Sequence, residues 1–186
     1  VGIVSSTGGP QTLRRLLSVV AKAPIHPIAV VQHTAVGHTK PLASWLAGVS
    51  GLRIAVVDDG DRIEPGMIAI APDDYHLEVR PGAIARLHHG PKVHSHRPSG
   101  TVLLRSLASS FGGHAAGVIL TGMGDDGAAG AEALEKRGGL ILIEEPDDAI
   151  LEGMPRAAMN CTSEAIVAAP EEIGRMLLCP SGRGDE

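Results

Sequence analysis

The sequence contains very few aromatic residues, since Trp45, Tyr75 and Phe111 are the only three among 186. Proteins that hold single-stranded nucleic acid stack bases on aromatic side chains, and this chain offers too few for such a platform. An excess of basic charge is lacking as well, because the formal net charge is −5. An acidic chain is unsuited to the phosphate backbone of nucleic acid or to an anionic membrane surface. We therefore expect no nucleic-acid partner.

Long hydrophobic runs are also missing. No apolar stretch approaches the roughly 20 residues that cross a bilayer, so we expect no membrane insertion. The two cysteines, Cys161 and Cys179, lie far apart and form no metal or redox spacing. They predict inert thiols and a cytoplasmic location. The chain shows no signal peptide and opens in an apolar run without a methionine, which predicts a fragment.

Short apolar runs alternate with helical patterns along most of the chain. Because the runs are almost wholly apolar, they predict strands of a mostly parallel sheet covered on both faces. A Pro81-Gly82 turn between two short runs predicts an inserted antiparallel hairpin. The expected fold is a doubly wound, Rossmann-like α/β domain over residues 1–180, followed by a loose polar tail at 181–186. Leu42, Trp45 and Leu46 are expected on the inner face of the second helix. The expected strands cover residues 1–4, 27–31, 54–57, 67–70, 77–79, 83–87, 115–120, 140–143 and 165–169.

The first strand ends in Ser5-Ser6-Thr7-Gly8-Gly9-Pro10, and a helical pattern follows. This order of strand, tight turn and helix holds a serine hydroxyl next to amides near a helix N-terminus. An ordinary strand-to-helix turn is the simpler interpretation. A nucleotide-phosphate turn is a third one, although the G-x-G-x-x-G spacing is absent.

Three groups suited to nucleophilic catalysis follow different strands: Ser6, His33 and Asp126. Open α/β sheets bind ligands outside the carboxyl ends of their strands, so the fold can bring the three to one crevice. A serine needs a base to take its proton, and the base needs a carboxylate to hold its tautomer. Structural capping explains many such residues equally well. His38 is an alternative base, and Asp125 an alternative carboxylate.

Several motifs follow one another along the chain: Ser6–Pro10, Gln32-His33 with Gly37 and Thr39, Pro65-Gly66, Ala71-Pro72, His96–Ser99, Gly117–Gly127 and Gly153–Arg156. In this order they resemble the catalytic domain of the chemotaxis protein-glutamate methylesterases (CheB-type) over nearly the whole chain.

The resemblance implies a cofactor-free serine hydrolase that removes methyl groups from glutamyl methyl esters of chemoreceptor cytoplasmic helices and releases methanol. Many members also deamidate receptor glutamines. It makes Ser6 the nucleophile, His33 the base and Asp126 the orienting carboxylate. Thr7 and Met123 match active-site positions, and the Met123 amide is a candidate oxyanion donor. The family's receiver domain is not in this chain, and it either precedes residue 1 in the full protein or is lacking.

Two stretches depart from the family pattern. Thr101 stands where an aspartate is usual, and the acidic segment Glu144–Glu152 replaces a Gln-x-Glu-x-x-x-Val-Val-aromatic sequence. We expect this segment to be an exposed loop near the crevice, where five carboxylates would repel an acidic receptor and favour a related signalling protein.

Two other interpretations stay open. The histidines His88, His89, His94 and His96 lack a cysteine or a close acidic partner, so a solvated loop is favoured over a metal site. The rival function is a catalytically inactive binding or scaffold module on the same fold. A paired His33 and Asp126 favour the enzyme, because a binding turn needs neither.

Overall fold

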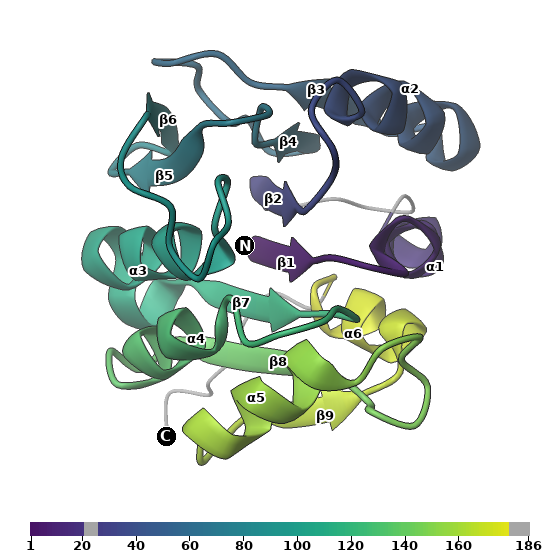
Figure 1. Ribbon diagram of the computed structural model, residues 1–186, viewed down its shortest axis with the longest axis vertical. Helices are drawn as coiled ribbons and strands as arrows, with labels where there is room; N and C mark the ends of the chain where they lie inside the picture. Colours follow the sequence, from purple (N-terminus) through teal and green to yellow (C-terminus); the bar gives the residue numbers. More distant parts are fainter. Residues whose placement is uncertain (21–25, 179–186) are drawn as a thin grey trace.

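Seven parallel strands form the centre of the domain (Figure 1), as the apolar runs predict. The computed structural model describes residues 1–20 and 26–178. The expected tail at 181–186 and Cys179 lie outside these residues. The sheet has the order β3-β4-β2-β1-β7-β8-β9. Its strands are β1 (Gly2–Ser5), β2 (Ile28–Gln32), β3 (Arg53–Val56), β4 (Met67–Ile70), β7 (Ala116–Ile119), β8 (Leu140–Glu144) and β9 (Ile166–Ala168).

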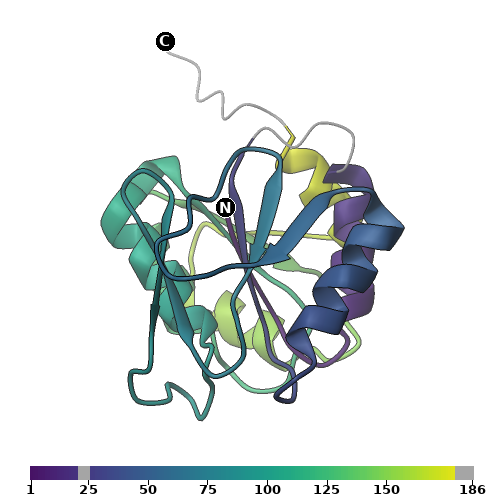
Figure 2. The same ribbon diagram turned by 90° about the horizontal axis from the view of Figure 1, so that it is seen from above.

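Helices cover both faces of the sheet, with α1 and α2 on one side and α3 and α4 on the other (Figure 2). Alternate residues of each central strand enter two apolar clusters: Ile3 and Val118 face α1, whereas Val4 and Ile119 face α3. Because both faces are buried, the strands read as continuous apolar runs. The helices are α1 (Gly9–Val20), α2 (Thr39–Ser50), α3 (Gly100–Phe111), α4 (Ala128–Glu135), α5 (Gly153–Cys161) and α6 (Pro170–Met176).

The predicted hairpin is a separate two-stranded antiparallel sheet of β5 (His76–Arg80) and β6 (Ile84–His88). It packs on α3, beside the main sheet. The segment that follows β6 leads back to the start of α3, and this return brings residues 93–101 to the carboxyl edge of the sheet.

The order of the strands reverses at β1, which lies between β2 and β7. The chain runs outward from β1 to one side first and fills the other side with β7, β8 and β9. In an open α/β sheet this switch point leaves a crevice outside the carboxyl ends of the strands. The segments that begin at Ser6, His33 and Leu120 all leave the sheet there.

The inner face of α2 differs from the expectation. Ala43 and Leu46 are buried, but Trp45 is 38% exposed, so its predicted place in the core is wrong. Trp45 lies two positions from Ala43, about 200° around the helix, and therefore points away from the sheet.

No helix in the described ranges is long and apolar enough to cross a membrane.

Two glycines test how tightly α3 is packed against β1. A Cβ on Gly100 would lie 2.1 Å from Cγ1 of Val4, whereas one on Gly48, exposed in α2, would meet nothing within 4 Å. We expect Gly100→Ala to lower the free energy of unfolding by about 2 kcal/mol through overpacking. Gly48→Ala should raise it by about 1 kcal/mol, because alanine favours a helix. Urea denaturation measures both, and an unchanged Gly100→Ala protein would contradict the packing described.

Candidate active site

Ser6 lies in the turn between β1 and α1, at the switch point of the sheet. Its backbone N–H donates to the Thr121 carbonyl (3.0 Å), and its own carbonyl accepts from Gly9 N–H (2.8 Å). Gly8 has a φ of +84°, a conformation that L side chains rarely adopt. The turn is close to the loop after β7, since a Cβ on Gly122 would lie 2.7 Å from the Cβ of Ser6. The Ser6 residue is only 9% exposed.

Gln32, the last residue of β2, holds this turn against the next strand. Its Nε2 donates to the carbonyls of Ser6 and His33, both at 2.8 Å, and its Oε1 accepts from the Ser5 hydroxyl at 2.7 Å. A Cβ on Gly9 would lie 2.0 Å from that Oε1, so only glycine leaves room for the Gln32 side chain and its hydrogen bonds. The sequence analysis includes Gln32 in a matching stretch but gives it no role. A polar residue at the end of a buried strand needs hydrogen-bond partners, and this is the signal that could have predicted its structural role.

His33 and Asp126 are in direct contact, with 2.8 Å between His33 Nε2 and Asp126 Oδ2. The fold thus brings two of the three predicted site residues into contact. Asp125 lies elsewhere: it is exposed, and it pairs with His94 at 2.8 Å. His38 is exposed at the start of α2. The geometry therefore selects His33 over His38 and Asp126 over Asp125 as the pair.

Asp126 is almost completely buried, yet its carboxylate accepts hydrogen bonds from the first residues of α3. The Ser99 hydroxyl donates to Oδ1 (2.6 Å), the Gly100 amide to Oδ2 (2.6 Å) and the Thr101 amide to Oδ1 (3.1 Å). Burial by itself raises the pKa of Asp126, but these donors and His33 outweigh it and hold the pKa well below its usual range. Asp126 is therefore ionised at neutral pH.

Thr101, the departure from the family pattern, takes part in this arrangement. Its Oγ1 accepts from the Gly127 amide (2.9 Å) while its own amide donates to Asp126. A threonine thus links the start of α3 to the loop that carries the carboxylate.

The tautomer of His33 follows from its contact with Asp126. Nε2 donates to the carboxylate, so in the neutral imidazole the lone pair is on Nδ1. Nδ1 is buried and has no hydrogen-bond partner among the described residues. Neither does the structure join Ser6 Oγ to another side chain in these residues. The backbones are adjacent, because His33 N–H donates to the Ser5 carbonyl at 3.0 Å.

His96 stacks on His33, with ring centroids 3.8 Å apart and an angle of 4° between the planes. Burial, and then the neighbouring His33, lower the pKa of His96, so it is neutral at pH 7. The sequence indicated only a turn near His96, because a stack between residues 63 positions apart leaves no local pattern.

Thr7 and Met123 are the other matched residues; Thr7 follows Ser6 in the turn, and Met123 lies in the loop after β7. The Thr7 carbonyl accepts from the Thr121 hydroxyl at 3.0 Å. The Met123 side chain is 74% exposed, and its amide donates to no group in the described part of the chain. This amide is therefore free to donate to a ligand.

The acidic segment is an exposed loop over most of its length, as the sequence predicts, with Glu145, Asp147, Asp148 and Glu152 all exposed, and Glu144 is the exception. Glu144 is completely buried at the end of β8, where it accepts from the Thr121 amide, and burial raises its pKa. Asp148 pairs with Arg15 at 2.8 Å, and Glu152 pairs with Arg156 at 2.8 Å. The segment does lie at the crevice, because the Gly122 amide donates to the Leu151 carbonyl at 3.0 Å.

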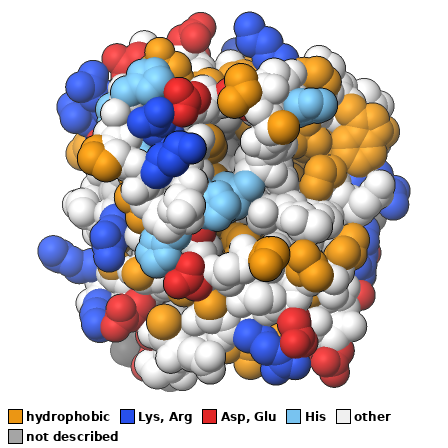
Figure 3. Space-filling model, in the orientation of Figure 1, with side chains coloured by type: hydrophobic (Ala, Val, Ile, Leu, Met, Phe, Trp, Pro, Cys, Tyr) orange, Lys and Arg blue, Asp and Glu red, His pale blue; other side chains and the backbone are white. Residues whose placement is uncertain are grey.

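The histidine-rich segment 88–96 makes separate contacts. His88 lies 3.5 Å from Glu78, and His89 lies 3.8 Å from Asp74. Within residues 1–20 and 26–178 no group of three His, Cys, Asp or Glu side chains has a geometry that could hold a metal ion. On the face drawn in Figure 3, histidines lie among both acidic and basic side chains.

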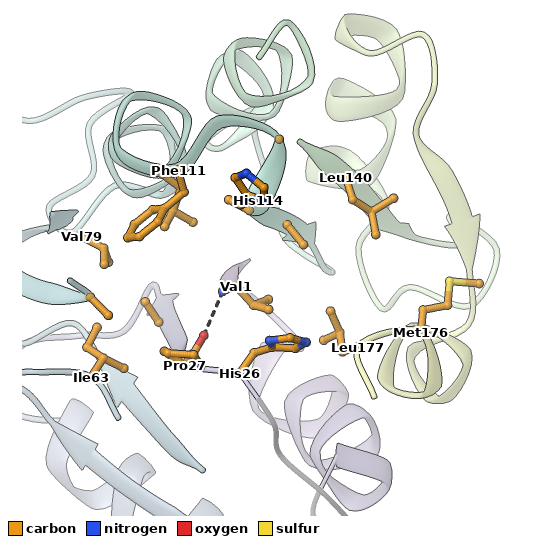
Figure 4. Close-up of a pocket in the computed structure, with 16 residues that line it drawn as sticks. Val1, His26, Pro27, Ile63, Val79, Phe111, His114, Leu140, Met176 and Leu177 are labelled. Carbon is orange, nitrogen blue, oxygen red and sulfur yellow. Dashed lines mark hydrogen bonds between the residues drawn. The ribbon is translucent and has the colours of Figure 1, made fainter. Parts of the chain in front are cut away.

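An apolar cavity of about 370 Å³ lies at the opposite edge of the sheet, where the strands begin (Figure 4). Val1, Pro27 and Leu140 line it, next to the starts of β1, β2 and β8, and the Val1 nitrogen donates to the Pro27 carbonyl at 2.9 Å. Ser6, His33 and Asp126 are not among its lining residues, so the cavity is separate from the candidate active site.

This geometry defines a class of protein: doubly wound α/β domains with a buried His–Asp pair beside a serine turn. A model of the CheB methylesterase family matches residues 1–177, and the chain belongs to that family.

Two curated relatives and one solved structure illustrate the similarity. The chain is 41% identical to "Protein-glutamate methylesterase/protein-glutamine glutaminase 3" of Anaeromyxobacter dehalogenans, over 95% of this chain and 52% of that protein. It is 38% identical to "Protein-glutamate methylesterase FrzG" of Myxococcus xanthus, over 96% and 53%. The crystal structure of the Thermotoga maritima CheB methylesterase catalytic domain superimposes with a TM-score of 0.90 at 32% identity, covering 95% of each chain. The chain thus spans about half the length of the curated relatives it matches.

The ionised state of Asp126 predicts an acid-dependent stability. Because its folded pKa is lowered, its contribution to stability is complete at neutral pH. It starts to fall near the unfolded value of about 4 and is lost as the pH drops through the folded pKa. We expect Asp126→Asn to cost about 2 kcal/mol at pH 7 and to flatten the stability curve between pH 5 and 3. Urea denaturation at several pH values measures this.

Asp125→Asn is the matched control, since this neighbour is exposed and its loss should change stability by about 0.5 kcal/mol or less. Equal pH curves for the two variants would contradict the assigned state of Asp126.

Proposed function

We propose that this domain is a protein-glutamate methylesterase that hydrolyses γ-methyl esters of glutamyl side chains with Ser6, His33 and Asp126. One observation above all supports the proposal: a buried, ionised Asp126 fixes His33 so that the free Nδ1 is the basic atom, next to the serine turn. A binding module of the same fold has no use for a buried carboxylate that orients an imidazole.

The reaction begins when the Ser6 hydroxyl rotates toward His33. Oγ attacks the ester carbonyl carbon as His33 Nδ1 takes the hydroxyl proton, and Asp126 stabilises the imidazolium that forms. The Met123 amide is the donor that we assign to the developing oxyanion, with the exposed turn residue Thr7 as support. The proton returns to the methoxy oxygen, so methanol leaves and Ser6 carries the glutamyl group as an ester.

Water completes the cycle. His33 removes a proton from water as it attacks the acyl-enzyme, and then returns this proton to Ser6 Oγ. One ester and one water thus give one carboxylic acid and one methanol. No step needs a metal or an organic cofactor. An amide that replaces the ester would release ammonia by the same route, as the glutaminase part of the relatives' names suggests for those proteins.

The substrate that we assign is a methylated helix on the cytoplasmic part of a chemoreceptor or of a related signalling protein. The names of the relatives support this partner class through the methylesterase activity, and the family match supports the chemotaxis role. We further propose that residues 1–180 are a catalytic domain that works in the cytoplasm. The unmatched half of the relatives' length is room for a receiver domain.

The three residues should act as a unit. We expect Ser6→Ala and His33→Ala each to lower methanol release from a methylated receptor fragment by about 10³-fold or more, and the double variant to be little worse than either. Asp126→Asn should lose less activity than either single variant, because the serine and the imidazole remain and only the tautomer of His33 is no longer fixed. His38→Ala is the matched control and should keep the normal rate, as should the unaltered protein with added chelator. Normal hydrolysis by Ser6→Ala would refute the assignment.

His96 should position His33 by holding its ring plane. We expect His96→Ala to lower kcat by about tenfold with little change in KM, and His96→Phe to restore most of it, because a flat ring can stack in the same place. A loss in kcat with little change in KM separates this positioning role from a role in substrate binding. Steady-state kinetics of the three proteins with a methylated receptor fragment measure kcat and KM.

His94→Ala is the control, since His94 pairs with Asp125 outside the stack. A His96→Ala protein with unchanged kcat would show that the stack has no part in catalysis.

A further inference from the structure

Ile150 is a large apolar residue that lies beside the nucleophile turn and remains 58% exposed. A Cβ on Gly8 would lie 2.7 Å from Cβ and 2.9 Å from Cδ1 of Ile150, so the isoleucine covers the residue two positions after Ser6. Its neighbour Leu151 fixes it there. The Leu151 amide donates to Thr121 Oγ1 (2.9 Å), and its carbonyl accepts from the Gly122 amide (3.0 Å).

Met123 presents a second apolar side chain, in the loop after β7 that approaches the same turn. It follows Gly122, the residue that approaches the Ser6 Cβ, and it is 74% exposed. Single exposed apolar side chains are ordinary on protein surfaces. Here two of them belong to segments that approach the Ser6 turn, and the backbone next to Ile150, at Leu151, is fixed by hydrogen bonds.

The carboxylates closest in sequence to Ile150 are paired with arginines. Asp148 is directed to Arg15, and Glu152 to Arg156. The remaining two, Glu145 and Asp147, are exposed and interact with the charge of Arg156.

We propose that Ile150 and the Met123 side chain contact the methyl group of the ester, so that the site binds a glutamyl methyl ester in preference to glutamine. This inference rests on the proposed function and adds the determinant of its specificity. The ester and the amide share one shape around the carbonyl, but the ester ends in an apolar methyl group. The amide ends in two N–H groups, which lose water and gain no acceptor on a hydrocarbon surface.

The test uses two peptides from a receptor methylation helix that differ at one side chain, glutamyl methyl ester or glutamine. Methanol release gives kcat and KM for the ester peptide. The glutamine peptide is added as a competitor, and its Ki is obtained whether or not it is itself hydrolysed. The ratio of this Ki to the ester KM reports the preference.

We expect the unaltered protein to favour the ester, and Ile150→Ala to reduce the ratio by about fourfold, the value of one buried methylene-sized contact. Ile150→Asn should reduce it further, to a total of about tenfold, because its side chain accepts an amide N–H. Met123→Ala, which keeps the backbone amide, should act in the same direction. In each variant the change should come from KM and Ki more than from kcat.

Ile166→Ala is the matched control, because Ile166 is 42% exposed in β9 and pairs with Leu142 away from the crevice. It should leave the ratio unchanged. An unaltered ratio in Ile150→Ala, Ile150→Asn and Met123→Ala, with normal methanol release, would overturn the inference and leave the proposed function standing. Absence of methanol from the unaltered protein would refute the proposed function and this contact with it.

Discussion

The buried carboxylate of Asp126 is the constraint on which the rest of the site depends. A charge removed from water costs several kcal/mol unless donors replace its hydration. Here the donors come from the start of α3 and from His33, at the end of β2. The loop after β7, the first turn of α3 and the end of β2 must therefore reach one point together. The contacts that bring these segments together in the folded domain are therefore the same contacts that orient His33.

Thr121 has a comparable role for the other half of the crevice. Its carbonyl accepts from the Ser6 amide, its hydroxyl donates to the Thr7 carbonyl and accepts from the Leu151 amide, and its own amide donates to buried Glu144. One residue thus joins the turns after β1, β7 and β8. This close approach explains the glycines beside it: a Cβ on Gly8 would collide with Ile150, and one on Gly122 with Met154 and Ser6.

The sequence predicts the parts of this protein that have a local pattern. Apolar runs mark the strands, and polar residues at their ends identify Ser6, His33 and Asp126 as candidates, because the strand order decides where those ends meet. The sequence does not reveal the hydrogen bonds of the Gln32 side chain or the stack of His96 on His33, because these contacts join segments far apart in the chain. The error at Trp45 has a related cause, since several rotations of a short helix with mixed apolar positions satisfy the same pattern.

The number of carboxylates in the acidic segment Glu144–Glu152 overstates the charge that the segment presents to solvent. Its carboxylates add up to a repulsive field only if they are exposed and unpaired, and in the structure this holds for Glu145 and Asp147 alone among the described ion pairs. Glu144 turns inward to a backbone amide, and Asp148 and Glu152 pair with arginines. Exposed ion pairs of this kind cancel most of each other's field beyond about one Debye length. The residue of the segment that lies against the serine turn is Ile150, beside Gly8. The contact that we propose there is short-range and acts on bound substrate, whereas repulsion by the carboxylates would act on its approach.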